Sequence, residues 1–202
     1  MNQQSESDAE YAARMARRKA EVDAKVAQAN ERRGIVVVLT GDGKGKSSSA
    51  FGTLARAVGH GFDCGVVQFI KGTWDVGEAR LFGDHPQVDF HVMGTGFTWE
   101  TRNRETDRRA ALAAWAQAER LLEDESKRLV VLDEITYVIT YGHLEAARVI
   151  ESIRFRPRHQ TVVITGRDAQ PALIDIADTV SEVRKIRHAF EHGVKAQAGV
   201  EF

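Results

Sequence analysis

The chain has 202 residues, of which 43% are hydrophobic, and its formal net charge is −1 at pH 7. This length suits one domain with a full-sized core, and the near-zero charge provides no overall field that would draw the protein to nucleic acid or to a membrane surface. A single cysteine, Cys64, excludes a disulfide framework or a cysteine-based zinc site within one chain, and we expect it to be a buried apolar residue. No apolar run approaches eighteen residues and the N-terminus has no secretory apolar core, so we expect a cytoplasmic protein.

Residues 1–33 form a polar, charged and alanine-rich leader. Ser7 followed by Glu10 predicts a capping box that starts a helix. The apolar side chains on one face of that helix are few: Tyr11, Met15, Val22 and Val26. Because so narrow a stripe makes the helix marginal in water, two interpretations stay open. The leader is partly disordered, or it is a helix that docks on the site of its own chain or of a partner subunit.

Apolar strands alternate with helices over residues 34–202, which we expect to form a single domain. The predicted strands are residues 35–40, 64–70, 88–93, 129–132, 161–165 and 179–187. The predicted helices are residues 47–59, 105–124, 144–153 and 171–178. This repeated order indicates an α/β protein of the P-loop NTPase-like kind, with a mainly parallel sheet of about six strands and helices on both faces.

The most informative segment joins the first predicted strand to the first predicted helix. It reads Thr40-Gly41-Asp42-Gly43-Lys44-Gly45-Lys46-Ser47. A glycine-rich loop between a strand and a helix presents its backbone N–H groups to a phosphate, and the helix N-terminus adds partial positive charge. The usual P-loop pattern has glycine where this chain has Thr40, although three glycines follow within five residues. A plain tight turn is the alternative, but Gly-Lys-Ser at a helix start favours a nucleoside triphosphate site.

The phosphate-binding residues that this segment predicts are Gly41, Asp42, Gly43, Lys44, Gly45, Lys46, Ser47 and Ser48. Two further basic residues, Lys71 and Arg167, also follow predicted strands, at the edge where ligands of such sheets bind. Each could face polyphosphate or could be an ordinary solvated charge.

An apolar strand that ends in two carboxylates, Asp133 and Glu134, suggests the metal half of the site. In P-loop proteins an acidic residue at such a position helps to hold Mg²⁺. Magnesium prefers octahedral oxygen ligation and uses one or two carboxylates, which Ser47 with Glu134 or Asp133 would satisfy. An acidic strand end on its own is weak evidence, because charges often occupy strand ends for solubility.

A second distinctive segment, Gly94-Thr95-Gly96-Phe97-Thr98-Trp99-Glu100, places two large aromatic residues in a glycine-flanked loop. Loops usually avoid exposed Phe and Trp because each leaves a large apolar surface in water. Phe97 and Trp99 therefore either pack into the core or provide a flat apolar surface for a ligand. Trp74, in Gly72-Thr73-Trp74, is a similar but weaker case.

These segments together resemble the P-loop type of ATP:corrinoid adenosyltransferases. The resemblance runs from about Gly34 to Phe202. It is carried by the P-loop and by these stretches: Ala57-Val58-Gly59-His60-Gly61, Val66-Val67-Gln68-Phe69-Ile70-Lys71-Gly72-Thr73-Trp74, Gly96-Phe97-Thr98-Trp99-Glu100-Thr101, Val131-Leu132-Asp133-Glu134 and Thr165-Gly166-Arg167.

The resemblance implies transfer of the 5′-deoxyadenosyl group from ATP to the Co(I) centre of a corrinoid, with release of tripolyphosphate, in adenosylcobalamin biosynthesis or salvage. It implies that ATP lies reversed along the loop, which exposes the ribose C5′ to the corrinoid. It assigns Mg²⁺ to Ser47 and Glu134, with Asp133 behind them, and the displacement of the corrinoid's lower axial ligand to Phe97 and Trp99. It also implies a homodimer in which the N-terminal segment covers the neighbouring site, and a transient flavodoxin-like reductant.

Two other functions stay open on the residues alone. A P-loop kinase or ATPase would use the same cradle for phosphoryl transfer, with Glu134 orienting the nucleophile. An ATP-gated corrinoid carrier would bind both ligands and turn over neither.

Overall fold

The computed structural model describes residues 6–70, 76–92 and 103–201. Its contacts divide the chain into two compact units, Met1–Arg32 and Arg33–Phe202. Within the described part of the chain no helix is both long and apolar enough to cross a membrane.

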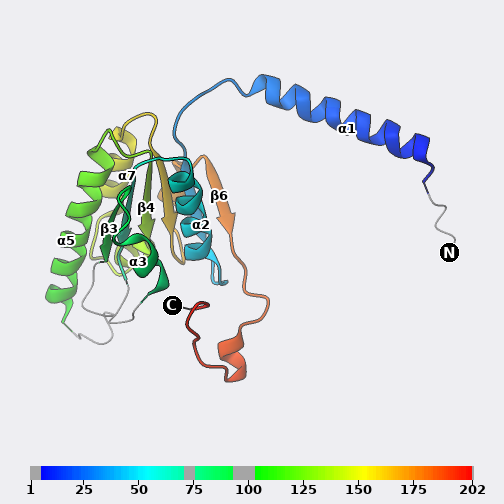
Figure 1. The fold of residues 1–202 in the computed structure, drawn as a ribbon. Helices are drawn as coiled ribbons and strands as arrows, with labels where there is room; N and C mark the ends of the chain where they lie inside the picture. The colour runs from blue at the N-terminus through cyan, green and yellow to red at the C-terminus, as the bar shows by residue number, and fades with distance from the viewer. Residues whose placement is uncertain (1–5, 71–75, 93–102, 202) are drawn as a thin grey trace. The chain divides into compact units, whose positions relative to one another are not determined.

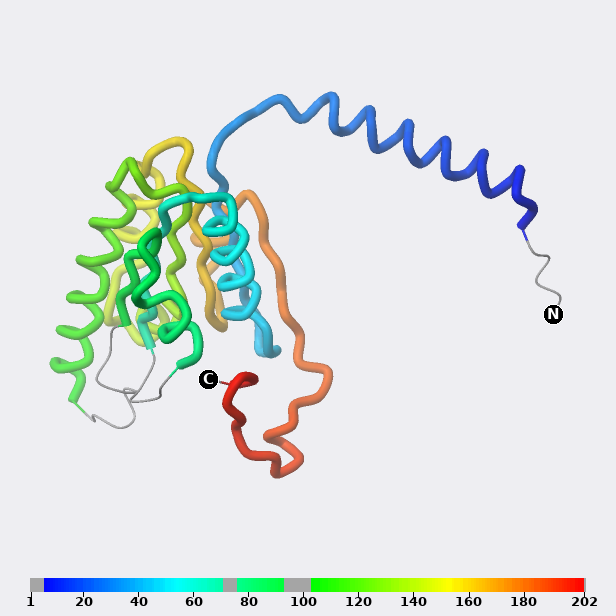
Figure 2. The backbone as a smooth tube through the Cα atoms, in the orientation of Figure 1, coloured from blue at the N-terminus to red at the C-terminus, as the bar shows by residue number. Residues whose placement is uncertain are grey.

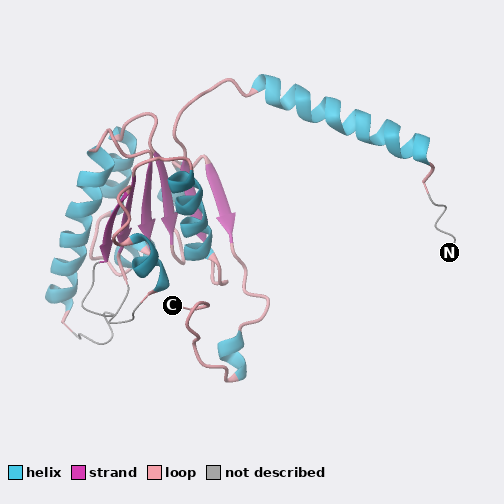
Figure 3. Ribbon diagram, in the orientation of Figure 1, coloured by secondary structure: helices cyan, strands magenta, loops and turns pink. Residues whose placement is uncertain are grey.

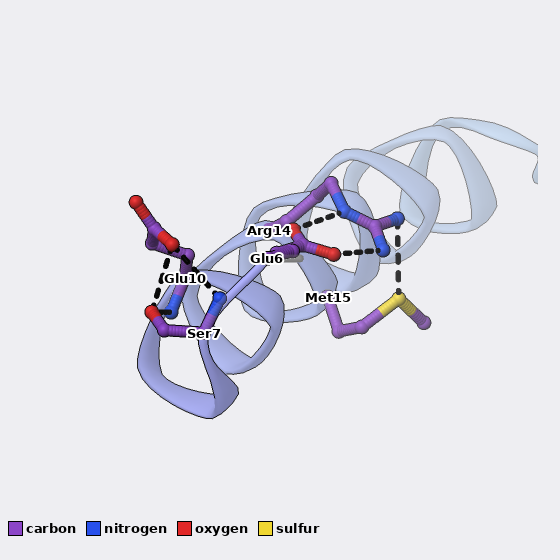
Figure 4. A network of polar contacts seen from close by, with 5 residues as sticks. All are labelled: Glu6, Ser7, Glu10, Arg14 and Met15. Carbon is purple, nitrogen blue, oxygen red and sulfur yellow. Dashed lines mark hydrogen bonds and ion pairs between the residues drawn. The ribbon is translucent and has the colours of Figure 1, made fainter. Parts of the chain in front are cut away.

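The first unit is the helix α1 (Asp8–Gln28), which begins at the predicted capping box. The Glu10 N–H donates to Ser7 Oγ at 3.3 Å, and the Ser7 N–H donates to Glu10 Oε2 at 2.9 Å. Figure 4 shows this pair beside a two-pronged ion pair, in which Arg14 Nε and Nη2 donate to the two carboxylate oxygens of Glu6 at 2.8 and 2.9 Å. No residue of α1 is buried, and Tyr11 and Val26 are 52% and 66% exposed. The first turn is therefore held by local polar contacts, while the apolar stripe stays in solvent.

The second unit is built on a six-stranded sheet in which every neighbouring pair is parallel (Figure 3). The strand order is β3-β2-β4-β5-β1-β6. The strands are β1 (Val36–Thr40), β2 (Cys64–Gln68), β3 (Val88–Val92), β4 (Leu129–Asp133), β5 (Thr161–Thr165) and β6 (Thr179–Glu182). Parallel strands need crossover connections, and the helices between them supply these.

Helices cover both faces of this sheet (Figure 1). One face packs against α2 (Lys46–Gly59) and α3 (Gly77–Phe82), and the other against α5 (Arg104–Glu123), α6 (Ile135–Thr140), α7 (Ala146–Phe155) and α8 (Pro171–Asp175). Trp115 of α5 is fully buried on the face that α5 to α8 cover, and all five residues of β4 are buried. The predicted α/β architecture, with a parallel sheet of six strands between two helical layers, is confirmed.

Cys64 is fully buried at the start of β2, as predicted. Burial raises the pKa of its thiol to about 11, because the charged thiolate is disfavoured away from water. The thiol is therefore protonated at neutral pH and packs as a small apolar group.

Several element boundaries differ from the sequence prediction. The six-residue helices α3 and α6 and the 3₁₀ helix η1 (Ala189–His192) were not predicted, because so few residues do not complete two helical turns of an apolar pattern. The strand predicted over 179–187 ends at Glu182, and the helix predicted over 171–178 ends at Asp175. Directly after Glu182 the Val183 carbonyl accepts from the N–H of the P-loop residue Gly43 at 2.7 Å, so the chain there contacts the P-loop instead of extending the strand.

One carboxylate, Asp178, ties the starts of two neighbouring strands together. Its Oδ2 accepts from the Val36 N–H at 2.8 Å and from Arg33 Nη1 at 2.9 Å. The Asp178 N–H donates in turn to the Val36 carbonyl at 2.9 Å. Hydrogen bonding to Arg33 lowers the pKa of Asp178 from 3.8 to about 2.

We expect Asp178→Asn to lower the free energy of unfolding by about 1 kcal/mol near pH 7, a value reduced for the partial exposure of the pair. Because the folded-state pKa lies below the unfolded one, the ionised carboxylate stabilises the fold above about pH 4 and loses this effect as the pH falls toward 2. Urea denaturation across this range measures the difference between variant and wild type, which should shrink at acid pH. Asp175→Asn, at an exposed carboxylate three residues earlier, is the control. A difference independent of pH would contradict the prediction.

Candidate functional site

A cavity of about 410 Å³ lies among the loops that follow the strands. Every segment that lines it comes after the carboxyl end of a strand, where ligands of parallel sheets bind. Its lining residues are Asp42, Gly43, Lys44, Gly45, Lys46, Ser47, Ser48, Gly77, Glu78, Leu81, Glu134, Tyr137, Arg167, His188, Gly199, Val200 and Glu201.

The P-loop between β1 and α2 has backbone conformations that require glycine. Gly41 and Gly45 have φ of 100° and 124°, which side-chain-bearing residues rarely adopt. A Cβ at Gly43 would lie 2.7 Å from the backbone of Arg184. Gly45 caps α2 without a side-chain hydrogen bond to the first turn, so the helix N-terminus opens on the cavity with backbone N–H groups suited to an anion.

Thr40, which departs from the usual P-loop pattern, anchors the loop. Its Oγ1 accepts from the Ala169 N–H at 3.1 Å, and its carbonyl accepts from the Val183 N–H at 2.8 Å. The threonine thus connects the base of the P-loop to the segments that follow β5 and β6.

Among the residues that the structure describes, three cations line the cavity: Lys44, Lys46 and Arg167. Lys46 Nζ donates to the Gly43 carbonyl at 2.7 Å, so its ammonium lies directly over the loop. Partial burial, with a smaller contribution from the charge of Arg167, lowers the pKa of Lys46. Burial disfavours the charged ammonium and Arg167 repels it, and an anionic ligand bound beside Lys46 would offset both effects.

The end of β4 places its two carboxylates differently. Asp133 is fully buried and does not line the cavity. Its oxygens accept from Thr165 Oγ1 at 2.7 Å and from Gln68 Nε2 at 3.1 Å. Glu134, the next residue, has φ of 61° and ψ of 23°, and it lines the cavity together with the P-loop residues.

The structure brings most of the predicted site residues together. Residues 42–48, Glu134 and Arg167 share the cavity, whereas Gly41 packs behind it against Val183. Four predicted residues lie outside the described ranges: Lys71, Trp74, Phe97 and Trp99.

Residues 183–201, which we name the C-terminal segment, were not predicted to belong to the site, yet four of them line the cavity: His188, Gly199, Val200 and Glu201. Figure 2 shows this segment, in red, returning to the strand ends. Lys44 Nζ forms an ion pair with Glu201 Oε2 at 2.8 Å, and the Lys185 N–H donates to Asp42 Oδ1 at 3.0 Å, which lowers the pKa of Asp42. Loops that follow parallel strands usually form the ligand site, so this segment could have been predicted to contribute. It was not, because the last strand was predicted to continue to Arg187, whereas the loop begins after Glu182.

Other lining residues were missed because they lie on unpredicted elements. Glu78 and Leu81 belong to α3, and Tyr137 belongs to α6. Tyr137 is half-buried, and this burial raises the pKa of its phenol, so the group is a neutral hydrogen-bond donor at neutral pH.

A strand, a glycine-rich loop and a helix N-terminus, with an acidic strand end at the same edge of a parallel sheet, define a P-loop protein of the α/β class. More narrowly, the chain belongs to the family described as ATP:corrinoid adenosyltransferase BtuR/CobO/CobP, whose model matches residues 32–202. A second model, described as cob(I)alamin adenosyltransferase N terminal, matches residues 1–26.

Curated relatives are similar along almost their whole length. The chain is 55% identical to the corrinoid adenosyltransferase CobA of Salmonella typhimurium over 97% of this chain and all of the relative. It is 53% identical to a corrinoid adenosyltransferase of Pseudomonas aeruginosa over the full length of both. It is 52% identical to a corrinoid adenosyltransferase of Escherichia coli over 97% of this chain and all of the relative.

The Lys44–Glu201 pair leads to a prediction about anion binding. We expect Glu201→Gln to tighten the binding of tripolyphosphate about two- to fivefold, because a carboxylate that competes for Lys44 is removed. Calorimetric titration at low ionic strength measures the change, and added salt should reduce it.

The matched control is Glu191→Gln, which removes the ion pair between Lys185 and Glu191 in the same segment without changing a cavity residue. An equal change in both variants would show that the effect is not specific to Lys44.

Proposed function

We propose that this protein transfers the 5′-deoxyadenosyl group of ATP to the cobalt of a corrinoid and releases tripolyphosphate. The observation that carries the proposal is a P-loop cavity in a chain more than half identical to a named corrinoid adenosyltransferase over that relative's full length. The Co(I) centre attacks the ribose C5′, a Co–C bond forms, and the C5′–O bond breaks with its electron pair leaving on the triphosphate. The corrinoid supplies the nucleophile, and the protein supplies position and electrostatics.

The residues of the P-loop would bind the triphosphate. Negative charge on the leaving group grows as the C5′–O bond breaks, and groups already aimed at that position stabilise it without reorganising. Lys46, Lys44, Arg167 and the N–H groups at the start of α2 share the cavity and suit this role. We propose that ATP lies along the loop in the direction opposite to that in ordinary P-loop NTPases. This orientation exposes C5′ to the corrinoid, instead of exposing the γ-phosphate to water.

The donor set of the cavity fits Mg²⁺. Ser47 offers a hydroxyl oxygen and Glu134 a carboxylate, and both line the cavity beside the phosphate-binding residues. The described residues contain no cluster of three or more His, Cys, Asp or Glu side chains that could hold a metal alone. Mg²⁺ does not need such a cluster, because it is usually held by one or two protein carboxylates together with substrate phosphates and water. The ion would offset the negative charge of the phosphates. The buried Asp133, which precedes Glu134, would support Glu134 without contacting the ion.

The aromatic residues Phe97 and Trp99 are proposed to contact the corrinoid and exclude its lower axial ligand. Support comes from the family membership and from the position of their loop in the chain, directly after β3 at the ligand edge of the sheet. Lys71 and Trp74 follow β2 in the sequence and are proposed to border the site.

We further propose that the protein acts as a homodimer in which the α1 helix of one subunit covers the site of the other. The exposed stripe of α1 and the separate family match to residues 1–26 support a docking role for this helix. A flavodoxin-like protein is the proposed transient reductant that produces Co(I).

A product assay separates this function from its competitors. ATP, Mg²⁺ and chemically reduced cob(I)alamin should yield light-sensitive adenosylcobalamin and tripolyphosphate. ADP with an unchanged corrinoid would indicate phosphoryl transfer, and binding of both ligands without product would indicate a carrier.

In the same assay Lys46→Ala should lower kcat/KM about 100-fold or more, because it removes a cation aimed at the leaving group. The control is Lys127→Ala, which changes a lysine before β4 at the opposite end of the strands. Circular dichroism should show that both variants keep the fold. Unchanged kcat/KM in Lys46→Ala would remove the P-loop lysine from the mechanism.

Phe97→Ala and Trp99→Ala should reduce activity more with cobalamin that a flavodoxin-like reductase must reduce than with pre-formed Co(I). The reason is that the proposed rings favour reduction by excluding an axial ligand, a step that pre-formed Co(I) bypasses. Initial rates with the two cobalamin sources measure the effect. Equal losses with both sources would contradict the proposed role.

A further inference from the structure

We propose that Thr165 is a positioning residue whose hydroxyl holds Glu134 in the backbone conformation that presents its carboxylate to the cavity. The inference rests on the proposed role of Glu134 at Mg²⁺ and adds a residue that does not itself touch the ligand.

The Thr165 hydroxyl forms two hydrogen bonds, one as donor and one as acceptor. Thr165 Oγ1 donates to Asp133 Oδ1 at 2.7 Å and accepts from the Glu134 N–H at 2.8 Å. Thr165 is fully buried at the end of β5, so no water competes for these bonds. One hydroxyl on β5 therefore bridges the side chain and the backbone of two consecutive residues at the end of β4.

The backbone at Glu134 needs such support. Strand β4 ends at Asp133 and helix α6 begins at Ile135, so a single residue makes the whole turn. Glu134 makes it with φ of 61° and ψ of 23°, a left-handed conformation in which the Cβ of an L-residue is crowded. Strained residues of this kind persist where the surroundings over-determine them, and they cluster at functional sites. Here the Thr165 hydroxyl pins the peptide that enters the turn.

The bridge is rigid because its partners are fixed from other directions. Gln68 Nε2 donates to the second Asp133 oxygen at 3.1 Å, and the Phe69 N–H donates to the Asp133 carbonyl at 3.0 Å. The carboxylate is thus held between β2 and β5. Thr165 is also held, since its strand pairs with β4 on one side and β1 on the other.

The same junction connects Glu134 to the P-loop. The Gly166 N–H donates to the Leu39 carbonyl at 3.2 Å, and Thr136 Oγ1 donates to the Arg167 carbonyl at 2.7 Å. A Cβ at Gly166 would overlap Thr136 Oγ1, so the first turn of α6 and the segment after β5 approach as closely as glycine allows. A shift of the turn after β4 relative to the segment after β5 would require these contacts to break. Thr165 therefore fixes one proposed Mg²⁺ ligand, Glu134, to the strand that pairs with β1, and β1 leads into the P-loop.

The test measures how much Mg²⁺ strengthens ATP binding. Calorimetry gives the Kd of ATP with excess Mg²⁺ and with a chelator, and the ratio of the two reports the contribution of the metal independently of catalysis. Glu134→Gln should abolish most of the enhancement. Thr165→Val, which keeps the shape but removes the hydroxyl, should weaken the enhancement about tenfold, and Thr165→Ser, which restores a hydroxyl, should be close to wild type.

Gln68→Met is the matched control. It removes the other hydrogen bond to Asp133 but leaves the bond to the Glu134 N–H, so it should lower the melting temperature and weaken the enhancement much less than Thr165→Val does. Should Thr165→Val fail to fold, Thr165→Cys is used in its place, because the cysteine thiol is a weaker hydrogen-bond donor and acceptor than the threonine hydroxyl.

Three outcomes are decisive. A wild-type enhancement in Thr165→Val would overturn the inference and leave the role of Glu134 intact. An equal loss in Gln68→Met would also overturn it, because general loosening of the buried polar group would then explain the effect. A wild-type enhancement in Glu134→Gln would instead refute the proposed metal ligand, while the product assay tests adenosyl transfer separately.

Discussion

The polar contacts that lock the carboxyl ends of β4, β5 and β1 together are the constraint on which the site depends. Parallel strands bring these ends to one edge, but the ladder alone does not orient the loops that leave it. Hydrogen bonds between these ends orient the loops. Thr165 bonds to Asp133 and Glu134, while Gly166 and Ala169 bond to Leu39 and Thr40 at the end of β1. The phosphate cradle and the acidic turn are thereby parts of one rigid edge, which favours electrostatic stabilisation because fixed dipoles need not reorganise.

Charge in the cavity is balanced rather than uniformly positive. Lys44, Lys46 and Arg167 face a space that also contains the carboxylates of Glu134 and Glu201. In this structure Lys46 donates to a P-loop carbonyl and Lys44 pairs with Glu201, so both lysines have partners that a triphosphate would replace. The C-terminal segment is therefore part of the electrostatics of the site as well as of its wall.

Much of the site could be predicted because its chemistry is local in the chain. The P-loop residues 42–48 are consecutive, and Glu134 and Arg167 follow apolar strands whose carboxyl ends must meet. The contribution of Glu201 could not be predicted in the same way, because its partner Lys44 is 157 positions away and the contact depends on where β6 ends. Likewise, nothing in the local pattern around Thr40 indicates that its hydroxyl binds Ala169.

The amino-acid sequence by itself determined the alternation of strands and helices, the phosphate-binding loop and the family, since these depend on periodicity and on residues adjacent in the chain. The family resemblance already assigned the metal-facing role to Glu134 rather than to Asp133, but the physical reason for the difference lies in the tertiary structure. Asp133 and Glu134 are chemically alike, but Asp133 ends a strand with its side chain among Gln68 and Thr165, whereas the left-handed turn directs Glu134 to the cavity. That difference arises from hydrogen bonds between strands far apart in sequence, which no local pattern encodes.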